Sequence, residues 1–292
     1  MEKNIKKIYL LLGIGITIIS FSGILIKISS APPLIIAFYR MLFSMSILTP
    51  IFIIKHRKEA HYFLDYRPIL GGFFLALHFF IWITSFQYTS VANAVLFIAL
   101  QPLFTLFLEL IFAREDLRTG IIHGLILTLI GSFIVSIGDL NLLFDKVWGD
   151  LLATVAALFA GIYLFIGRSL REKVNYFPYI YILYTYTTVF LLIFTLIKSI
   201  PLSGYARVNY LYFLAMALGP TLIGHSALNY SVRFLPTTIV SLSILGEPIL
   251  TTIFAWILLG EKITTLTFIG GLFIIVGIYR AVVKGNKIVE IE

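Results

Sequence analysis

The chain has 292 residues, of which 60% are apolar and 12% are charged. Because soluble domains carry about 25% charged residues, this composition excludes a soluble globular protein and predicts an all-α membrane protein that crosses the bilayer many times. The net charge of +8 does not indicate nucleic-acid binding, since the basic residues fall in short segments between apolar stretches. The chain has no cysteine, which excludes disulfides and thiol chemistry.

Ten stretches are long and apolar enough to cross a membrane as helices. The first follows a group of lysines, as a signal peptide would. Its apolar run over 8–26 is longer than the roughly 7–15 residues of a signal-peptide core, so we interpret it as an uncleaved first helix. The predicted spans are 8–27, 34–54, 69–89, 91–113, 119–138, 148–167, 178–198, 209–231, 235–259 and 264–283.

The distribution of lysine and arginine predicts how these spans are oriented. With the amino terminus in the cytoplasm, 16 of the 22 basic residues fall in cytoplasmic segments, five fall in outer segments, and Arg40 lies inside a span. This asymmetry follows the positive-inside rule. We therefore predict a multi-pass protein of the plasma (inner) membrane with both termini in the cytoplasm.

The second half of the chain repeats the first at a constant offset of 146 residues. The stretch that begins at Gln101-Pro102 corresponds to the stretch that begins at Glu247-Pro248. The matched pairs include Ser85 and Ser231, Pro102 and Pro248, Thr105 and Thr251, Glu115 and Glu261, Gly124 and Gly270, and Gly131 and Gly277. We predict two five-helix repeats, 1–145 and 146–292. Because five is odd, the second repeat is inverted relative to the first.

Each repeat has a polar residue directly before a proline in the middle of a span. Glu247 lies about 18 Å from either end of the apolar stretch 235–259, at about 1.5 Å per helical residue. A carboxylate at that depth is costly and indicates a functional site. Pro102 and Pro248 each remove a helical hydrogen bond, and Gly246 adds local freedom. Interrupted helices between inverted repeats are typical of substrate sites; the alternative is that both prolines only kink helices for packing.

Tyr39 and Arg40 lie in the second span, about 10 Å below its outer end. The guanidinium could hold a substrate carboxylate through two parallel hydrogen bonds, or it could pair with Glu247. The alternative is that the Arg40 side chain extends outward to the lipid headgroups.

Further polar residues share helix faces at spacings of three or four. Small residues at that spacing, such as Ala153, Ala157 and Gly161, indicate close helix packing instead, and the glycines of spans one, five and ten are interpreted in the same way. Histidines and carboxylates are natural proton carriers, although a histidine inside a span can also bond to a neighbouring carbonyl. The candidate site residues are Glu247, Gln101, Arg40, Tyr39, His78, Trp82, Ser85, Tyr163, His225, Asn229 and Ser243.

The sequence carries no recognisable catalytic constellation. It has no glycine-rich phosphate loop, no Walker sequence and no nucleophile elbow. We therefore predict no enzymatic activity, no metal site and no cofactor, and ATP hydrolysis by this chain is not supported as an energy source.

Several stretches carry a family resemblance. They are 29–40, 77–82, 88–93, Gln101-Pro102, 224–230, 245–248 and 259–261. Together they resemble the drug/metabolite transporter superfamily, specifically its EamA-like family, over nearly the whole chain. The resemblance implies a ten-helix basket with a central cavity lined mainly by spans 1, 3, 4, 6, 8 and 9. The first half has Gln101 where the second has Glu247, so the two proline sites are not chemically equivalent.

The repeats, the interrupted helices and the resemblance together predict a secondary active transporter. We expect it to export a small organic solute, such as an amino acid or related metabolite, by alternating access, with protons as the candidate coupling ion. Two alternatives stay open: a passive facilitator, and a lipid-acting membrane enzyme or flippase-like protein with the same cavity. The expected partners are a small-molecule substrate, protons and membrane lipids, without nucleic acid, and the expected oligomeric state is monomer or homodimer.

Overall fold

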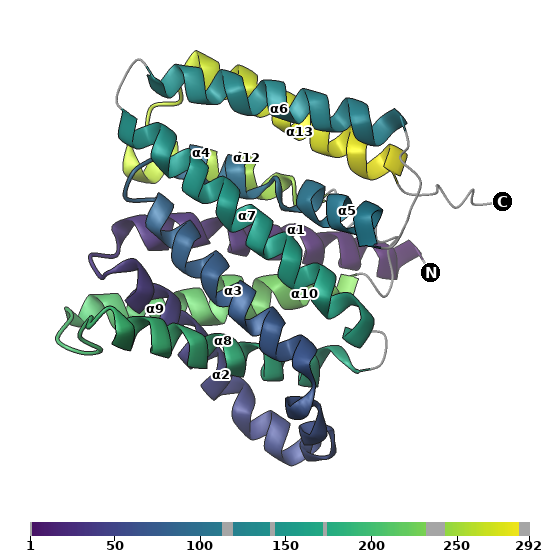
Figure 1. Ribbon diagram of the computed structural model, residues 1–292, viewed down its shortest axis with the longest axis vertical. Coiled ribbons are helices and arrows are strands. Elements are labelled where there is room, and N and C mark those ends of the chain that lie inside the picture. Colours follow the sequence, from purple (N-terminus) through teal and green to yellow (C-terminus); the bar gives the residue numbers. More distant parts are fainter. Residues whose placement is uncertain (1, 113–118, 141–143, 172–173, 232–242, 286–292) are drawn as a thin grey trace.

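The computed structural model describes residues 2–112, 119–140, 144–171, 174–231 and 243–285. Every regular element within these ranges is a helix (Figure 1). The elements are α1 (Glu2–Ile28), α2 (Pro33–Lys55), the 3-10 helix η1 (Arg57–Leu64), α3 (Tyr66–Ser85), α4 (Val91–Ile98), α5 (Gln101–Phe112), α6 (Thr119–Leu140), α7 (Phe144–Arg171), α8 (Tyr176–Ile197), α9 (Arg207–Met216), the π-helix η2 (Ala217–Gly224), α10 (His225–Ser231), α12 (Gly246–Leu259) and α13 (Thr265–Gly285).

The helices have the length and composition of membrane spans. Six helical stretches within the described ranges are long and apolar enough to cross a bilayer, and four shorter apolar stretches of 10–17 residues accompany them. Large apolar side chains face outward on several helices, including Leu10 (65% exposed), Phe133 (66%) and Trp256 (60%). Such a surface suits lipid and not water. The prediction of an all-helical membrane protein is confirmed, whereas the count of ten spans stays a prediction.

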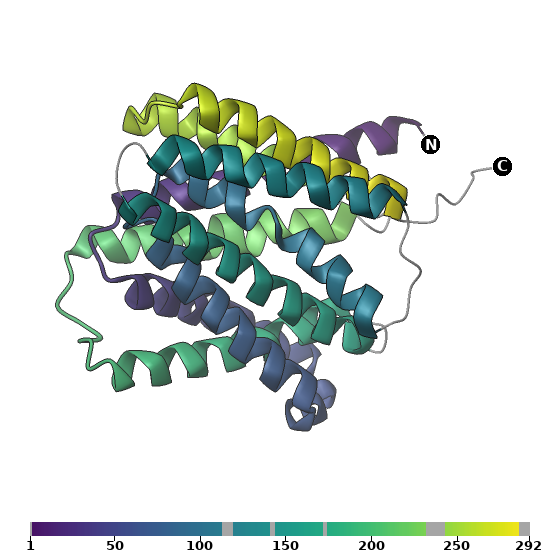
Figure 2. The same cartoon turned by 45° about the horizontal axis from the view of Figure 1, so that its top comes forward.

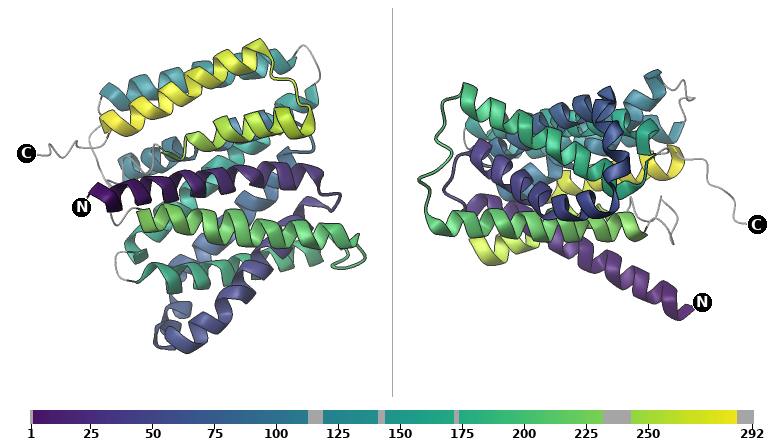
Figure 3. Two further views of the ribbon diagram at one scale, coloured as in Figure 1. Left: turned by 180° about the vertical axis from the view of Figure 1, so that it is seen from behind. Right: turned by 90° about the horizontal axis from the view of Figure 1, so that it is seen from below.

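The helices form one bundle with α6 and α13 side by side along one edge (Figures 1 and 2). α2 and α8 pack together toward the opposite edge, and α3 packs against both α7 and α8. α1 lies between α12 and the stretch formed by α9, η2 and α10, as Figure 3 shows from behind. The polar side chains of α1 therefore lie close to two interrupted stretches of the second half.

Glycines allow α6 and α13 to approach each other closely. A β-carbon built on Gly131 would lie 2.5 Å from the carbonyl oxygen of Gly270, and one on Gly270 would lie 2.6 Å from the carbonyl oxygen of Gly131. A β-carbon built on Gly161 of α7 would lie 3.0 Å from the β-carbon of Phe104. These contacts confirm the packing interpretation for these glycines. Gly13 of α1 is different, because a β-carbon there has nothing within 4 Å.

We expect Gly131→Ala to lower the free energy of unfolding by about 1–3 kcal/mol, because the added carbon meets backbone that cannot move aside. Gly13→Ala is the matched control. Its added carbon meets nothing, so the better helix propensity of alanine predicts no loss, or a gain of up to about 1 kcal/mol. Thermal unfolding of both purified variants in detergent measures the difference. Equal midpoints for Gly131→Ala and the wild type would contradict a tight α6–α13 contact.

The two predicted proline sites coincide with helix interruptions. The fourth predicted span is divided into α4 and α5 by a turn at Ala99 and Leu100, and α12 restarts at Gly246 after a turn at 244–245. Pro102 and Pro248 each lie in the first turn of the restarted helix, where a missing N–H is tolerated. Pro248 has no N–H to donate to the carbonyl oxygen of Ile244. That oxygen accepts from the N–H of Glu247 at 2.9 Å instead.

A third interruption lies in the eighth predicted span. Residues Ala217–Gly224 form the π-helix η2 around Gly219-Pro220. The hydroxyl of Thr221 donates to the carbonyl oxygen of Met216 at 2.9 Å, five residues back. Wide turns of this kind are frequent at functional sites. Here the wide turn presents Thr221 to the interior of the bundle, where it is 3% exposed.

Candidate functional site

Arg40 is buried in the interior of the bundle, with 2% of its surface exposed. Its Nε donates to Thr221 Oγ1 at 2.8 Å, and its Nη1 donates to Ser22 Oγ at 3.1 Å. The guanidinium carbon lies 4.7 Å from the centre of the Phe79 ring. Residues from α1, α3 and η2 therefore hold one cation on α2, and the alternative that Arg40 extends to the headgroups does not describe this structure.

The partners of Arg40 were not among the predicted site residues. Ser22 and Thr221 are ordinary hydroxyls in apolar stretches, and Phe79 is one phenylalanine among 26. Thr221 reaches Arg40 from the π-helical turn η2 around Gly219-Pro220, and the sequence alone does not show which side chain such a turn presents. Tyr184 of α8 is a further missed residue, since it is buried and interacts electrostatically with both Arg40 and Tyr163.

Glu247 lies in the first turn of α12, next to the helix interruption, and is half-buried. Its carboxylate interacts electrostatically with Arg40. The ion pairs within 4.0 Å among the described residues join His56 to Glu59 and Arg67 to Asp65, so Arg40 and Glu247 do not touch directly. Arg40 and Glu247 are thus opposite charges that interact without a direct ion pair in a membrane protein.

Hydrogen bonds between α1 and α12 fix the backbone around Glu247. Ser20 Oγ approaches the carbonyl oxygen of Glu247 at 3.5 Å, at the limit of a hydrogen bond, and Thr251 Oγ1 donates to the carbonyl oxygen of Ser20 at 3.0 Å. Both hydroxyl residues are buried. Because Ser22 binds Arg40 from the same region of α1, that helix connects the two charges structurally.

His78 and Trp82 lie on one face of α3 that packs against α7. The Nδ1 atom of His78 lies 3.0 Å from the carbonyl oxygen of Ala156, and its ring stacks on Trp82 with the ring centres 5.8 Å apart. The indole Nε1 of Trp82 is buried and has no hydrogen-bond partner in the described part of the chain. His225 of α10 interacts electrostatically with both Arg40 and His78, which places the two histidines and the arginine in one electrostatic neighbourhood.

The other predicted residues are distributed more widely. The hydroxyl of Tyr39 donates to the carbonyl oxygen of Leu202 at 2.8 Å, and its ring stacks on Phe213, so Tyr39 faces the loop after α8. Ser85 donates to the carbonyl oxygen of Trp82 at 2.6 Å. Gln101 begins α5 and is half-buried. Tyr163 and Ser243 are also half-buried. The side chain of Asn229 lies outside the described residues.

The start of α4 is held by two carboxylates from the second half of the chain. Thr89 Oγ1 donates to Asp150 Oδ1 of α7 at 2.7 Å. The N–H of Val91, in the first turn of α4, donates to the carboxylate of Glu261, with the nearer oxygen at 3.0 Å. These contacts connect the start of α4 to α7 and to the segment that follows α12.

We expect Glu261→Ala to lower the free energy of unfolding by about 1 kcal/mol, because it removes an acceptor at a helix amino terminus. Hydrogen exchange at the amides of residues 91–94 should accelerate in the same variant. Glu59→Ala in η1 is the control, since that carboxylate lies near His56 and far from α4 in the chain. Unchanged exchange at α4 in Glu261→Ala would contradict a stabilising contact there.

The fold and the site together define a class of protein. The chain is a multi-pass helical membrane protein that keeps a buried cation, a half-buried carboxylate and two histidines in one electrostatic neighbourhood beside interrupted helices. Charged groups inside a membrane bundle mark solute or ion pathways. The EamA-like transporter family matches residues 6–137 and 147–283, and the chain belongs to this family, which is part of the drug/metabolite transporter superfamily. It is a membrane transporter.

Individual relatives agree with this assignment. The uncharacterised transporter YdfC of Bacillus subtilis (strain 168) is 25% identical over 286 residues, which cover 95% of this chain and 91% of the relative. An uncharacterised transporter of Archaeoglobus fulgidus is 26% identical over 296 aligned residues, which cover 97% and 99%. A protein of known crystal structure shares the fold, with a TM-score of 0.63 and 16% identity over 94% of this chain and 97% of that one.

Proposed function

We propose that this protein is a secondary active transporter that exports a small organic solute, such as an amino acid or related metabolite, in exchange for protons. The observation that carries the proposal is the pair of opposite charges, Arg40 and Glu247, which interact without a direct ion pair, with Glu247 next to the break that precedes α12. A solute that carries both a carboxylate and an ammonium group could pair its carboxylate with Arg40 and its ammonium group with Glu247.

The donors around Arg40 favour an anionic group on the solute. A guanidinium has five N–H groups, and two of them find acceptors among the described residues, both neutral hydroxyls. The buried N–H of Trp82 is a further donor without an acceptor in the same part of the chain. A buried unpaired donor costs about 1–3 kcal/mol, and a carboxylate oxygen would offset that cost.

Alternating access would follow from two inverted five-helix halves, residues 1–145 and 146–292, arranged as a ten-helix basket around a central cavity. The family matches the chain twice, over 6–137 and 147–283. Helix packing supports the same division. In two repeats, α1 (span one) corresponds to α7 (span six), and α3 (span three) corresponds to the stretch that contains η2 and α10 (span eight). The contact of α3 with α7 then has its counterpart in the contact of η2 and α10 with α1. In this arrangement both termini lie in the cytoplasm, as the positive-inside rule predicts.

A ligand screen followed by a flux assay tests the proposal. Purified protein is heated with amino acids, amines, nucleosides and nucleotide sugars, since a ligand of the folded state raises the unfolding midpoint. The compound with the largest shift is then loaded into proteoliposomes. Accumulation against its gradient that stops when the pH gradient is dissipated supports coupled transport. Downhill flux that ignores the pH gradient identifies a passive facilitator, and turnover of a lipid identifies an enzyme.

A further inference from the structure

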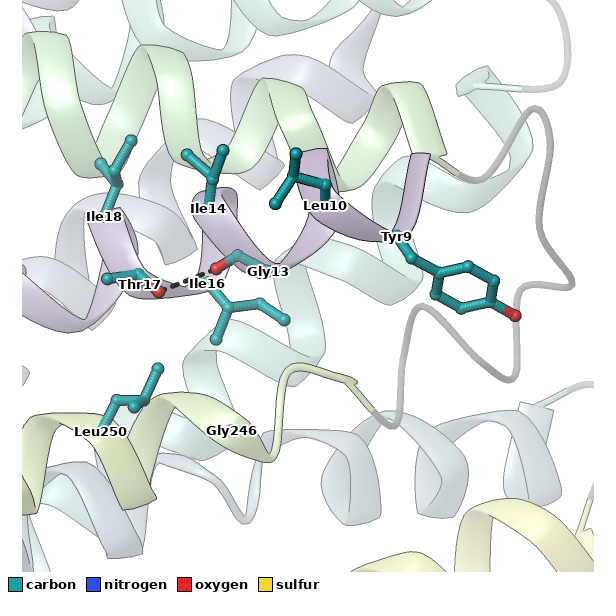
Figure 4. A pocket seen from close by; sticks show the side chains of 9 residues that line it. All are labelled: Tyr9, Leu10, Gly13, Ile14, Ile16, Thr17, Ile18, Gly246 and Leu250. Atoms are coloured by element: carbon teal, nitrogen blue, oxygen red, sulfur yellow. Dashed lines mark hydrogen bonds between the residues drawn. The ribbon is translucent and has the colours of Figure 1, made fainter. Parts of the chain in front are cut away.

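An apolar groove of about 570 Å³ runs between α1 and α12 (Figure 4). Ile16 of α1 and Leu250 of α12 project into the space between the two helices. The hydroxyl of Thr17 is satisfied by the carbonyl oxygen of Gly13 at 2.8 Å. Among the described lining side chains, the hydroxyl of Tyr9 is therefore the polar group that no hydrogen bond within the groove satisfies. Its volume lies within the roughly 300–1,000 Å³ range of ligand pockets.

Exposed apolar side chains form the rim of the groove. Tyr9, Leu10 and Ile14 line it and are 46%, 65% and 47% exposed. All three belong to the stretch of α1 that has the composition of a membrane span. Such a rim faces hydrocarbon, where a groove is filled by lipid chains and not by solvent. Gly13 contributes to the depth of the groove, since no atom would approach a β-carbon there within 4 Å.

The length of the groove matches one leaflet of a bilayer. Its lining on α1 extends from Tyr9 to Ile18. Nine helical steps of 1.5 Å cover about 14 Å, close to half of a hydrocarbon layer of about 30 Å. At its deep end the groove reaches Gly246 and Leu250, on either side of Glu247 in the chain. A chain in the groove would therefore lie against the break that carries the proposed coupling residue.

Two exposed lysines lie at the shallow end of the groove. Six of the seven lining residues of α1, all but Ile16, fall into two rows with spacings of four, so each row follows one helix face. Lys6 precedes the row of Tyr9, Gly13 and Thr17 by three residues, and Lys7 precedes the row of Leu10, Ile14 and Ile18 by three residues. Both lysines are exposed at the start of α1. Each face of the groove thus ends in a cation where a headgroup region begins.

We propose that the groove between α1 and α12 binds an anionic phospholipid, with one acyl chain between Tyr9 and Gly246 and the phosphate at Lys6 and Lys7. Apolar lining, an exposed apolar rim, the length of one leaflet and two cations at one end all fit that one ligand. A zwitterionic lipid would offer the same chain without the net negative charge that two lysines favour. The site is independent of the identity of the transported solute.

Lipid titration of the purified protein tests the proposal. Native mass spectrometry and thermal unfolding are followed while phosphatidylglycerol or phosphatidylcholine with the same acyl chains is added to the protein in detergent. We expect phosphatidylglycerol to bind first and to raise the unfolding midpoint. Lys6→Gln with Lys7→Gln should weaken phosphatidylglycerol binding about 30-fold, because each surface lysine contributes about a factor of five.

Two further variants separate the groove from general surface charge. Gly13→Leu places a side chain in the open groove without meeting neighbouring atoms at its β-carbon, so the protein should fold and lose the lipid. Lys55→Gln with Lys58→Gln removes two exposed lysines elsewhere and should change nothing. Equal responses to both lipids in the wild type would refute the role of the lysines. Full phosphatidylglycerol binding by Gly13→Leu would refute the groove as the site.

Discussion

Replacing Glu247 with glutamine is expected to abolish accumulation of the solute against its gradient and to leave the protein folded. Glutamine has nearly the same shape as glutamate, but it can neither carry a negative charge nor exchange a proton. The side chain is half-buried and makes no direct ion pair with any described residue, so its neutralisation breaks no salt bridge in that part of the chain. Accumulation driven by an imposed pH gradient should fall to the level of protein-free liposomes, while the unfolding midpoint should stay within a few degrees of the wild type.

Glu261→Gln is the matched control, because it makes the same chemical change near the other end of α12. That variant should retain gradient-driven flux, since the amide oxygen can still accept from the N–H of Val91. Downhill exchange of the solute should also survive in Glu247→Gln if the residue acts only on the proton. Normal proton-driven accumulation in Glu247→Gln would contradict the role of Glu247 as the proton carrier.

The architecture could be predicted from the sequence because a bilayer constrains helices strongly. Apolar length predicted the spans, and mid-span prolines predicted the interruptions now seen before α5 and before α12. The interruptions lie one to three residues before Gln101-Pro102 and Glu247-Pro248, because proline is tolerated best in the first turn of a helix. The predicted spans 69–89 and 91–113 left a single residue between them, whereas residues 86–90 separate α3 from α4 in the structure.

The composition of the site could be predicted only in part. Arg40, His78 and Glu247 were recognisable because charged and titratable groups inside a span are costly and therefore rare. Ser22 and Thr221 were not, because hydroxyl residues are common in spans and bond to their own backbone. Only the three-dimensional arrangement shows which hydroxyl meets the guanidinium. Tyr39 illustrates the reverse case, since sequence proximity to Arg40 did not predict that its hydroxyl would bind Leu202.

The energetics of Arg40 show why its contacts alone do not explain its presence. Burial of an ion costs several kcal/mol. The two hydrogen bonds to Thr221 and Ser22 return about 1.5–3 kcal/mol each, and the contact with Phe79 adds about 2 kcal/mol. The sum of these terms is close to zero. An ion without a clear contribution to stability serves another purpose, and binding of an anionic group is the purpose favoured by the donors that have no acceptor among the described residues.

Arg40→Met should therefore change the free energy of unfolding by less than about 2 kcal/mol in either direction while it removes solute binding. Methionine fills the space of the aliphatic stem, and Thr221 keeps its bond to the carbonyl oxygen of Met216. Loss of a buried, charge-assisted contact with a solute carboxylate costs about 2–5 kcal/mol, so the dissociation constant should rise at least about 30-fold. Unfolding midpoints and equilibrium binding of the solute found in the screen measure the two effects separately.

Arg40→Lys distinguishes charge from geometry in the same experiment. A lysine keeps the positive charge but lacks the planar fork that reaches Thr221 and Ser22 together. Binding intermediate between the wild type and Arg40→Met would show that the charge attracts the solute and that the fork orients it. If Arg40→Met unfolds several kcal/mol more easily, yet binds the solute normally when folded, the arginine is a structural clamp between α1, α2 and η2 and the solute must bind elsewhere.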